Sequence, residues 1–330
     1  MMSAGRVLIA ACLLGVACAF STPSAQRGTS ALQDRRNSAG VSGSAQIQEI
    51  GQTAAPREAR SSLGPLVFGC LLGLVVAVTG TSQAALAGAP GKWGYTDTKE
   101  WNAAFPLCTG KEQSPIDLKT SVVSSTSKDS LASSLSYAPL KGVEIFNNAA
   151  KNVQVNGGFG TFKLPDGDYE VKQFHFHFPA EHEVDGKLAA GELHIVHQKK
   201  GSSGTDGLAV VGIILDEQSS AAGTPELKFM EQLGFGTELP GKNSITTVAD
   251  PLDLNAFANE YAGGFYHYTG SLTTPPCAEK VHWYVCQKTV PVTKAMVNSF
   301  KARFPENNRP VQPLNTRQLV ASSLSVPGEF

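Results

Sequence analysis

Residues 173–198 read QFHFHFPAEHEVDGKLAAGELHIVHQ, and five of the seven histidines of the 330-residue chain lie within this stretch. Its first part, residues 174–178, alternates strictly between phenylalanine and histidine. Successive side chains of a β-strand point to opposite faces of the sheet. The alternation therefore predicts a strand with His175 and His177 on one face and three phenylalanines on the other.

The second half of the stretch predicts a partner for this strand. Residues 192–198 also alternate, and the pattern places His194 and His197 on opposite faces. Residues 184–187 read Val-Asp-Gly-Lys, which is typical of a tight turn, so we expect the two strands to pair antiparallel. The imidazole of His194 would then converge with the two imidazoles of the first strand.

Three converging imidazoles favour a metal ion. Imidazole suits zinc, and three protein ligands leave a fourth position for water, which is the pattern of catalytic rather than structural zinc sites. In the alternative the histidines form only a polar strand face, but three imidazoles that lose their hydration together are costly to bury without a cation. His197 points away from the other three and is predicted to be a hydrogen-bonded core residue. His182, in the turn, is predicted to be structural.

The two ends of the chain differ in composition. Six of the 27 basic residues but only three of the 28 acidic residues precede residue 88. Residues 88–330 are slightly acidic and long enough for one globular domain with a sizeable core. Because they contain neither a strongly basic segment nor an internal repeat, we expect no nucleic-acid partner and no repeat architecture.

The first 87 residues predict a targeting leader in three parts. Residues 1–19 combine Arg6, an apolar run and a terminal Ala-Cys-Ala, as secretory signal peptides do. Residues 20–62 are rich in Ser, Ala and Arg and poor in acids, as transit peptides are. Residues 63–87 contain a second apolar run and end in Ala-Leu-Ala, a second small-residue cleavage site.

This order resembles the bipartite leaders of algae with secondary plastids, whose second signal directs a protein across the thylakoid membrane. The resemblance implies a thylakoid-lumen location with no stable membrane insertion after processing. The alternative is a secreted protein, or one anchored through residues 63–87, although the apolar run at residues 63–78 is short for a membrane span.

Downstream of the leader, alternating and apolar segments predict many strands and few helices. Strands are predicted at residues 143–146, 153–155, 161–164, 208–215 and 281–285, and helices at residues 101–105, 225–233 and 292–304. The continuous apolar run at residues 208–215 predicts a strand buried on both faces. Ser-rich residues 120–136 predict a surface loop. The pattern as a whole predicts a mixed, β-dominated fold with a largely antiparallel sheet.

Further motifs occur in the order found in one known family. They are Gln113-Ser114-Pro115-Ile116-Asp117, Tyr268-Thr269-Gly270-Ser271-Leu272-Thr273-Thr274-Pro275-Pro276 and Asn307-Asn308-Arg309-Pro310. With the histidine strands, they make residues 93–318 closely resemble the alpha class of carbonic anhydrases. The resemblance implies a large, twisted central sheet with peripheral helices. It also implies reversible hydration of carbon dioxide to bicarbonate and a proton by zinc-bound hydroxide.

The resemblance assigns roles to single residues around the metal. The zinc ligands would be His175, His177 and His194, and the residues that support them would be Gln173, Glu192 and Asn307. Such supporting hydrogen bonds fix the tautomer and the ring orientation of a ligating histidine.

The resemblance also assigns the residues that act on the substrate. Thr273 would accept a hydrogen bond from the hydroxide and donate one to Glu181, which orients the hydroxide for attack. Thr274 would assist substrate binding. Carbon dioxide would lie against an apolar wall formed by Val196, Val210, Leu272 and Trp283.

Three of the six cysteines lie outside the leader. Cys108 and Cys277 occupy the positions of the disulfide found in many exported family members, and that bridge would tie the amino-terminal segment to the loop that carries Thr273. Cys286 is expected to be a buried free thiol. The alternative, three reduced cysteines, fits only a reducing compartment.

One segment departs from the family pattern. Fast members commonly carry Gly-His after a pair of asparagines, and that histidine carries the proton to solvent. Here Asn147-Asn148 is followed by Ala149-Ala150, and no histidine precedes His175. Lys151 is a poor relay because an ordinary lysine titrates near 10.4. We therefore expect proton transfer to limit turnover.

The second hypothesis for function is a non-catalytic binding or adhesion domain of the same fold. Such domains usually lack one or more zinc histidines, whereas this chain has all three together with Thr273 and Glu181. A zinc protease is weaker still, since the chain has no His-Glu-x-x-His motif. The sequence leaves the oligomeric state open.

Overall fold

The computed structural model describes residues 93–127, 130–148 and 151–322. The leader segments predicted at residues 1–87, and Ala149 and Ala150, lie outside the described residues. The strands of the large sheet are β2 (Val123–Ser127), β3 (Leu135–Tyr137), β4 (Glu144–Asn147), β5 (Val153–Asn156), β6 (Gly160–Leu164), β7 (Gly167–His177), β10 (Gly191–Lys199), β11 (Leu208–Glu217), β12 (Ile245–Thr247), β13 (Phe265–Ser271), β14 (Glu279–Cys286), β15 (Val290–Val292) and β16 (Leu319–Ser322).

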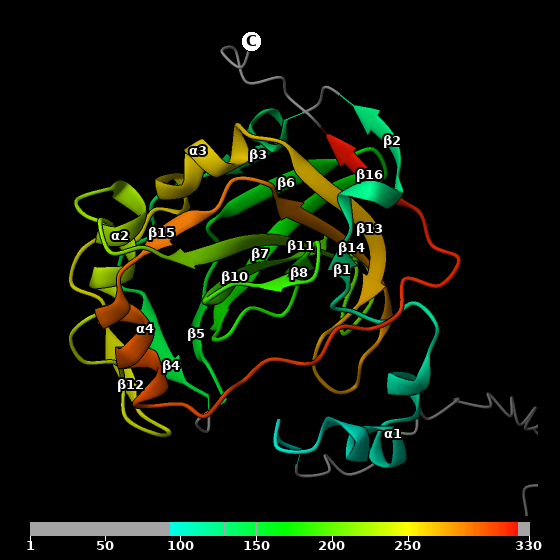
Figure 1. Cartoon of the computed structure of the whole chain (residues 1–330). Coiled ribbons are helices and arrows are strands. Elements are labelled where there is room, and N and C mark those ends of the chain that lie inside the picture. The colour runs from blue at the N-terminus through cyan, green and yellow to red at the C-terminus, as the bar shows by residue number, and fades with distance from the viewer. Residues whose placement is uncertain (1–92, 128–129, 149–150, 323–330) are drawn as a thin grey trace, which may run out of the picture. The chain divides into compact units, whose positions relative to one another are not determined.

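This sheet dominates the described part of the chain (Figure 1). Its main path runs β12-β4-β5-β7-β10-β11-β14-β13-β16-β2, with β3, β6 and β15 paired beside it. Most neighbours pair antiparallel, and the parallel pairs are β11 with β14, β11 with β15, and β16 with β2. The predicted fold class is confirmed.

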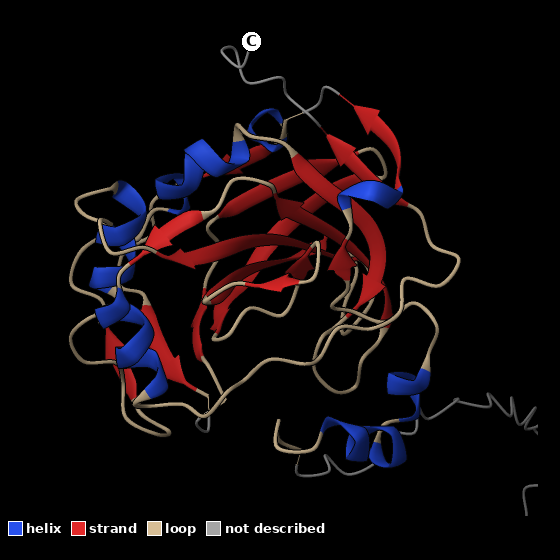
Figure 2. Ribbon diagram, viewed as in Figure 1, coloured by secondary structure: helices blue, strands red, loops and turns tan. Residues whose placement is uncertain are grey.

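The helices are short and lie at the margins of the sheet (Figure 2). They are α1 (Trp101–Ala104), α2 (Pro225–Gln232), α3 (Ala258–Tyr261) and α4 (Lys294–Lys301), with 3-10 turns η1 (Thr98–Glu100), η2 (Pro106–Thr109), η3 (Thr120–Val122), η4 (Leu131–Ser133) and η5 (Leu254–Phe257). Thr293 caps α4 by accepting a hydrogen bond from Met296 N, and the residue before it, Val292, ends β15. The helix predicted at residues 292–304 therefore begins two residues later, because the segment before the cap pairs as a strand.

The two faces of β7 divide the interior. Phe174 and Phe176 are fully buried in the larger apolar core, where Phe174 packs on Phe229 of α2 at 5.4 Å between ring centroids. His175 and His177 lie on the other face, as the alternation predicted. Strand β11, on the far side of β10, is buried over residues 208–215, which confirms the strand predicted to be covered on both faces.

The turn between the two histidine strands forms a separate hairpin. Strands β8 (Glu183–Val184) and β9 (Lys187–Leu188) pair antiparallel, and β8 also pairs with β1 (Asp117–Leu118) in a small three-stranded sheet. Asp185 and Gly186 have φ angles of 48° and 74°, the left-handed backbone that two-residue hairpin turns require. The predicted turn and the antiparallel pairing of β7 with β10 are confirmed.

The prediction of a surface loop at residues 120–136 is wrong in part. That segment contains η3, β2, η4 and the start of β3, and β2 pairs with β16 at the end of the sheet path. An edge strand pairs on one side only, so it tolerates the polar, serine-rich sequence that the loop prediction was based on.

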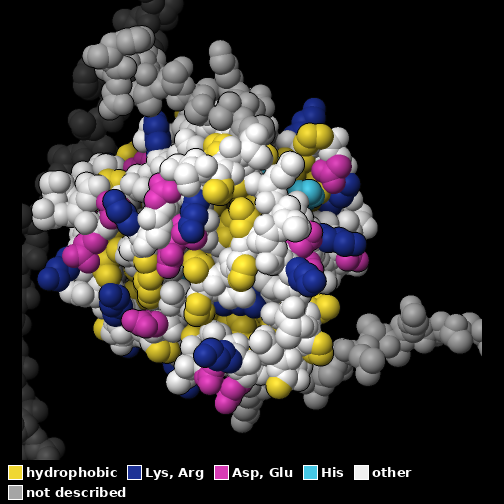
Figure 3. Space-filling view, turned by 45° about the vertical axis from the view of Figure 1, so that its right-hand side comes forward, with side chains coloured by type: hydrophobic (Ala, Val, Ile, Leu, Met, Phe, Trp, Pro, Cys, Tyr) yellow, Lys and Arg dark blue, Asp and Glu magenta, His cyan; other side chains and the backbone are white. Residues whose placement is uncertain are grey.

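Charged side chains of both signs are interspersed over the face that Figure 3 shows. Within the described residues, no helix is long and apolar enough to cross a membrane.

Glu260 on α3 makes the stability depend on pH. The residue is 2% exposed, and its Oε2 has no hydrogen-bond partner among the described residues. Burial, and after it the charge of Glu226, raise the pKa of Glu260 from the ordinary 4.5 to about 7, although Asn259 and Lys288 act in the opposite direction. Between these two pKa values the folded state keeps a proton that the unfolded state has lost. Stability must therefore fall as the pH rises through this window.

We expect Glu260→Gln to remove this loss and to raise the free energy of unfolding at pH 8 by on the order of 1 kcal/mol, with little change at pH 4.5. Urea denaturation at both pH values measures it. Glu231→Gln, which changes an exposed glutamate on α2, is the control. An equal fall in stability between the two pH values in wild type and Glu260→Gln would contradict the prediction.

Candidate metal centre

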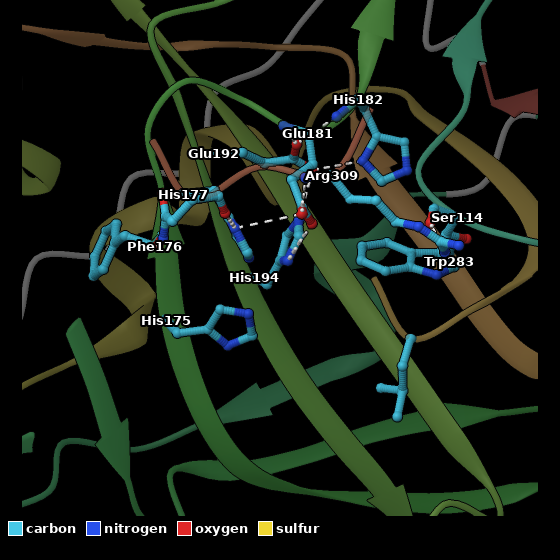
Figure 4. Close-up of polar contacts among 12 residues, drawn as sticks. Ser114, His175, Phe176, His177, Glu181, His182, Glu192, His194, Trp283 and Arg309 are labelled. Carbon is cyan, nitrogen blue, oxygen red and sulfur yellow. Dashed lines mark hydrogen bonds and ion pairs between the residues drawn. The ribbon is translucent and has the colours of Figure 1, made fainter. Parts of the chain in front are cut away.

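Three histidines converge on one point of the sheet. His175 and His177 lie on β7, and His194 lies on β10 directly opposite His175. Their ring centroids are 4.6 to 5.3 Å apart, and one ring nitrogen of each lies within 4.8 Å of the others. Figure 4 shows the three rings facing a common space, with Phe176 directed away from it.

Hydrogen bonds occupy one nitrogen of each β7 imidazole. Nδ1 of His175 lies 2.8 Å from Gln173 Oε1, and Nδ1 of His177 lies 2.6 Å from the carbonyl oxygen of Asn307. Both acceptors are oxygens, so each Nδ1 carries the hydrogen and each Nε2 keeps a free lone pair. The Asn307 side chain adds support, since its Oδ1 accepts from Phe178 N and its Nδ2 donates to Phe176 O.

In His194 the two ring nitrogens have exchanged roles relative to His175 and His177. Nε2 lies 2.9 Å from Glu192 Oε1, which leaves Nδ1 for the shared space. The same carboxylate oxygen lies 2.7 Å from His182 Nδ1, and His182 Nε2 lies 2.7 Å from the Tyr268 hydroxyl. Burial would raise the pKa of Glu192, but His182 and His194 outweigh it and hold that pKa well below its ordinary value.

The residues present fit a metal ion. Nε2 of His177 is buried and has no hydrogen-bond partner among the described residues. Its lone pair therefore faces the shared space and is free to bind a metal ion. Burial first, and the neighbouring histidines second, lower the pKa of His177 to about 3 and that of His175 well below 6.5. Both imidazoles are therefore neutral near pH 7, the form that binds a metal.

A second group of potential ligands consists of His182, Glu192 and His194. Here the atoms are at hydrogen-bonding distances of 2.7 and 2.9 Å, with a carboxylate oxygen between two ring nitrogens. Glu192 Oε1 already accepts from His182 Nδ1, so this group positions His194 through Glu192 rather than offering three free ligand atoms.

Thr273 and Glu181 lie together beside the histidines. Both residues are buried, Thr273 interacts with the Glu181 carboxyl electrostatically, and the main-chain N–H of Arg309 donates to Glu181 Oε1 at 2.8 Å. Burial raises the pKa of Glu181 well above its ordinary value, and these two interactions act in the opposite direction. A cation between the three histidines would also favour the ionised carboxylate.

An apolar wall borders the histidines on the side away from β7. Val196, Val210 and Trp283 are buried in one apolar cluster, and Leu272 packs against it. Trp283 contacts His194 at 4.8 Å between ring centroids. The four residues predicted as the wall thus lie together, and Thr274 follows Thr273 in a partly exposed position.

Long-range contacts complete the site, and two of them were not predicted from the sequence. One is the Tyr268–His182–Glu192 chain, which continues to Ser114 through a 2.8 Å hydrogen bond. The other is the hydrogen bond from Arg309 N to Glu181. No local spacing could have indicated either, because the partners come from distant parts of the sequence.

His197 faces away from the site and hydrogen-bonds the Tyr137 hydroxyl at 2.8 Å, as expected of a core residue.

A disulfide joins Cys108 in η2 to Cys277, as the resemblance implied, and Cys286 is a buried free cysteine. The loop that carries Cys277 is closed by two main-chain hydrogen bonds, Cys277 N to Thr274 O and Leu272 N to Ala278 O. The guanidinium of Arg309 binds the Cys108 carbonyl oxygen at 3.2 Å. The disulfide therefore connects the amino-terminal segment to the loop that carries Thr273. The hydrogen bonds of Arg309 connect the same segment to Glu181.

Comparison with known proteins gives consistent matches. A family model described as eukaryotic-type carbonic anhydrase matches residues 96–323. A carbonic anhydrase from Nostoc sp. is 36% identical over 267 residues, covering 76% of this chain and 94% of its own. The alpha-carbonic anhydrase structure from Photobacterium profundum has a TM-score of 0.59 and 29% identity, over 69% of this chain and 100% of its own. A Thermovibrio ammonificans alpha-carbonic anhydrase, solved with the inhibitor sulfanilamide, has the same TM-score and identity, over 69% and 98%.

The ligand set predicts the effect of single histidine substitutions. His194→Ala should remove most of the bound zinc, because two imidazoles on one strand remain. His197→Ala should retain the zinc and instead cost about 1–3 kcal/mol of stability, since it leaves the buried Tyr137 hydroxyl without its partner. Metal analysis of the purified proteins distinguishes them. Full zinc content in His194→Ala would rule out this set of ligands.

The disulfide predicts a large stability difference. Replacing Cys108 and Cys277 by serine removes a bridge across a sequence separation of 169 residues, and should lower the free energy of unfolding by up to roughly 5 kcal/mol. Chemical denaturation with and without reductant measures it. The control Cys286→Ala should keep the sensitivity to reductant. A wild-type midpoint that does not respond to reductant would contradict the prediction.

Proposed function

The chain belongs to the eukaryotic-type, or alpha-class, carbonic anhydrases, and we propose that it hydrates carbon dioxide reversibly to bicarbonate and a proton with zinc held by His175, His177 and His194. One observation carries the proposal. All three imidazoles have one nitrogen engaged by an oxygen, and their remaining nitrogens face one space. Bound zinc in carbonic anhydrases lowers the pKa of water to about 7, a property of the family rather than a measurement on this chain.

In this proposal Thr273 and Glu181 orient the attacking oxygen. Thr273 would donate its hydroxyl hydrogen to the neighbouring Glu181 carboxylate, and its oxygen would then have only lone pairs to offer to the reaction space. It can therefore accept a hydrogen from the oxygen nucleophile, whose free lone pair then points at the substrate carbon. Arg309 N holds Glu181 in place for this donation.

The substrate would lie against the apolar wall. Carbon dioxide is small and apolar, so it gains from contact with Val196, Val210, Leu272 and Trp283 while displacing water there. Bicarbonate is charged and is not favoured by such a surface, which would assist its release. Thr274, which is partly exposed and follows Thr273 in the chain, would hydrogen-bond the substrate oxygens.

A non-catalytic binding domain of the same fold is the alternative. It has no need for the Thr273–Glu181 pair or for buried neutral imidazoles, and both are present. The deciding experiment is carbon dioxide hydration by residues 88–330, with and without sulfanilamide. We expect sulfanilamide-sensitive hydration that His194→Ala lacks. A zinc-loaded chain without hydration activity would support the binding domain.

We also propose that the protein acts in the thylakoid lumen of a secondary plastid. The support is the order of signal, transit-like segment and second apolar segment in the first 87 residues, together with a disulfide that an oxidising compartment would preserve. Native protein is expected to begin near Gly88. An amino terminus before residue 63 would favour the membrane-anchored alternative.

Proton transfer is expected to limit turnover. Ala149 and Ala150 follow Asn148 where a transfer histidine commonly stands, and the ammonium of Lys151 lies 3.5 Å from the Trp93 ring centroid. Ala150→His, or Ala149→His if the register differs by one, should raise turnover in dilute buffer by about tenfold or more while leaving kcat/KM nearly unchanged. Stopped-flow hydration at several imidazole concentrations measures it. Wild-type turnover that does not depend on buffer concentration would contradict the prediction.

A further inference from the structure

A cavity of about 410 Å³ lies outside the metal centre, between the β8–β9 hairpin and the strands β11, β13 and β14. Val184, Leu188 and Ile214 supply apolar walls, and Leu188 is 46% exposed at its mouth. Small-molecule sites commonly have volumes of about 300–1,000 Å³, apolar walls and a few polar groups. The size and the lining of this cavity are of that kind.

Two polar side chains in the cavity lack protein partners. Tyr266 is 7% exposed, and neither its hydroxyl nor the side-chain amide of Gln287 hydrogen-bonds another described residue. Most of the Tyr266 side chain is buried while its hydroxyl has no protein partner, so that hydroxyl is available to a ligand in the cavity that Tyr266 lines.

The charges around the cavity favour a cation. Asp185 and Asp216 both line it, against a single Lys187. The carboxylate of Asp185 is held by the main-chain N–H and the hydroxyl of Thr120, at 2.9 to 3.1 Å, so its position is fixed before a ligand arrives. Burial first, and the negative charge of Asp185 second, raise the pKa of Tyr266 above its ordinary value.

We propose that this cavity binds a small organic cation, a primary ammonium group on an apolar body the size of a phenethyl group. The ammonium group is received by Asp216, Asp185 and the Tyr266 hydroxyl, and the apolar body lies against Leu188, Val184 and Ile214.

The cavity has a direct physical connection to the metal centre. His182 lies at its inner end, and the ring of His182 binds Glu192, which in turn lies against His194. A ligand that restrains His182 also restrains this chain of contacts. Binding in the cavity should therefore strengthen metal binding by the three histidines, with slower metal loss as its sign, and by linkage the metal should strengthen binding in the cavity by the same factor.

The test is a calorimetric titration of the zinc-loaded protein with phenethylammonium in the presence of saturating sulfanilamide, which keeps the probe out of the catalytic space. We expect one binding event with a dissociation constant in the millimolar range, at least about fivefold tighter than that of neutral 2-phenylethanol. Zinc release to a chelator should become at least about twofold slower with the probe bound.

Two substitutions examine the walls. Leu188→Ser and Asp216→Asn should each weaken probe binding by at least about threefold. Matched controls are Leu107→Ser, which changes the other strongly exposed leucine among the described residues, and Asp206→Asn, neither of which lines the cavity. Binding that sulfanilamide abolishes, or equal affinity in Leu188→Ser and Leu107→Ser, would overturn the proposal. Binding that leaves zinc release unchanged would overturn the connection to His182. The binding result is independent of whether the chain hydrates carbon dioxide.

Discussion

The antiparallel register between β7 and β10 is the constraint on which the rest of the structure depends. It sets His194 opposite His175, and because side chains alternate along a strand, His177 lies on the same face. A shift of one residue would turn His194 into the core and bring Ile195 or Leu193 into the site. Leu193 and Ile195 oppose such a shift, since both are fully buried in the apolar core on the opposite face of β10.

Three imidazoles buried together need polar partners for their ring nitrogens, and the residues around them supply these partners. Each imidazole has one nitrogen next to an oxygen, from Gln173, Asn307 or Glu192. The supporting groups are themselves held, as Glu192 is by the main-chain N–H groups of residues 181 and 182 at 2.9 and 2.8 Å. A network of this kind fixes both the tautomer and the direction of each ring before a metal binds.

The carboxy-terminal segment connects this network to the amino-terminal one. Asn307 and Arg309 are both buried and reach His177 and Glu181 through main-chain atoms. The Arg309 guanidinium also binds Gln113 and the Cys108 carbonyl, so the disulfide and the catalytic pair share one anchoring residue. The back of the network, at His182, borders the cavity for which we propose an organic cation. Changes at either of these places would reach the metal centre through hydrogen bonds rather than through the apolar core.

The sequence by itself determined the strands that carry the histidines, the face on which each histidine lies and the turn between them, because alternation and turn chemistry are local properties. It also indicated the buried β11, whose apolar run needs no partner to be recognised. Residues 120–136 were misjudged because an edge strand and a polar loop have the same composition. Only the tertiary structure decided which atoms hold the histidines: the acceptor for His177 comes from Asn307, 130 positions away, and it is a carbonyl oxygen that every residue possesses. A main-chain partner of this kind leaves no mark on the sequence, so its place is decided by how the distant segments pack.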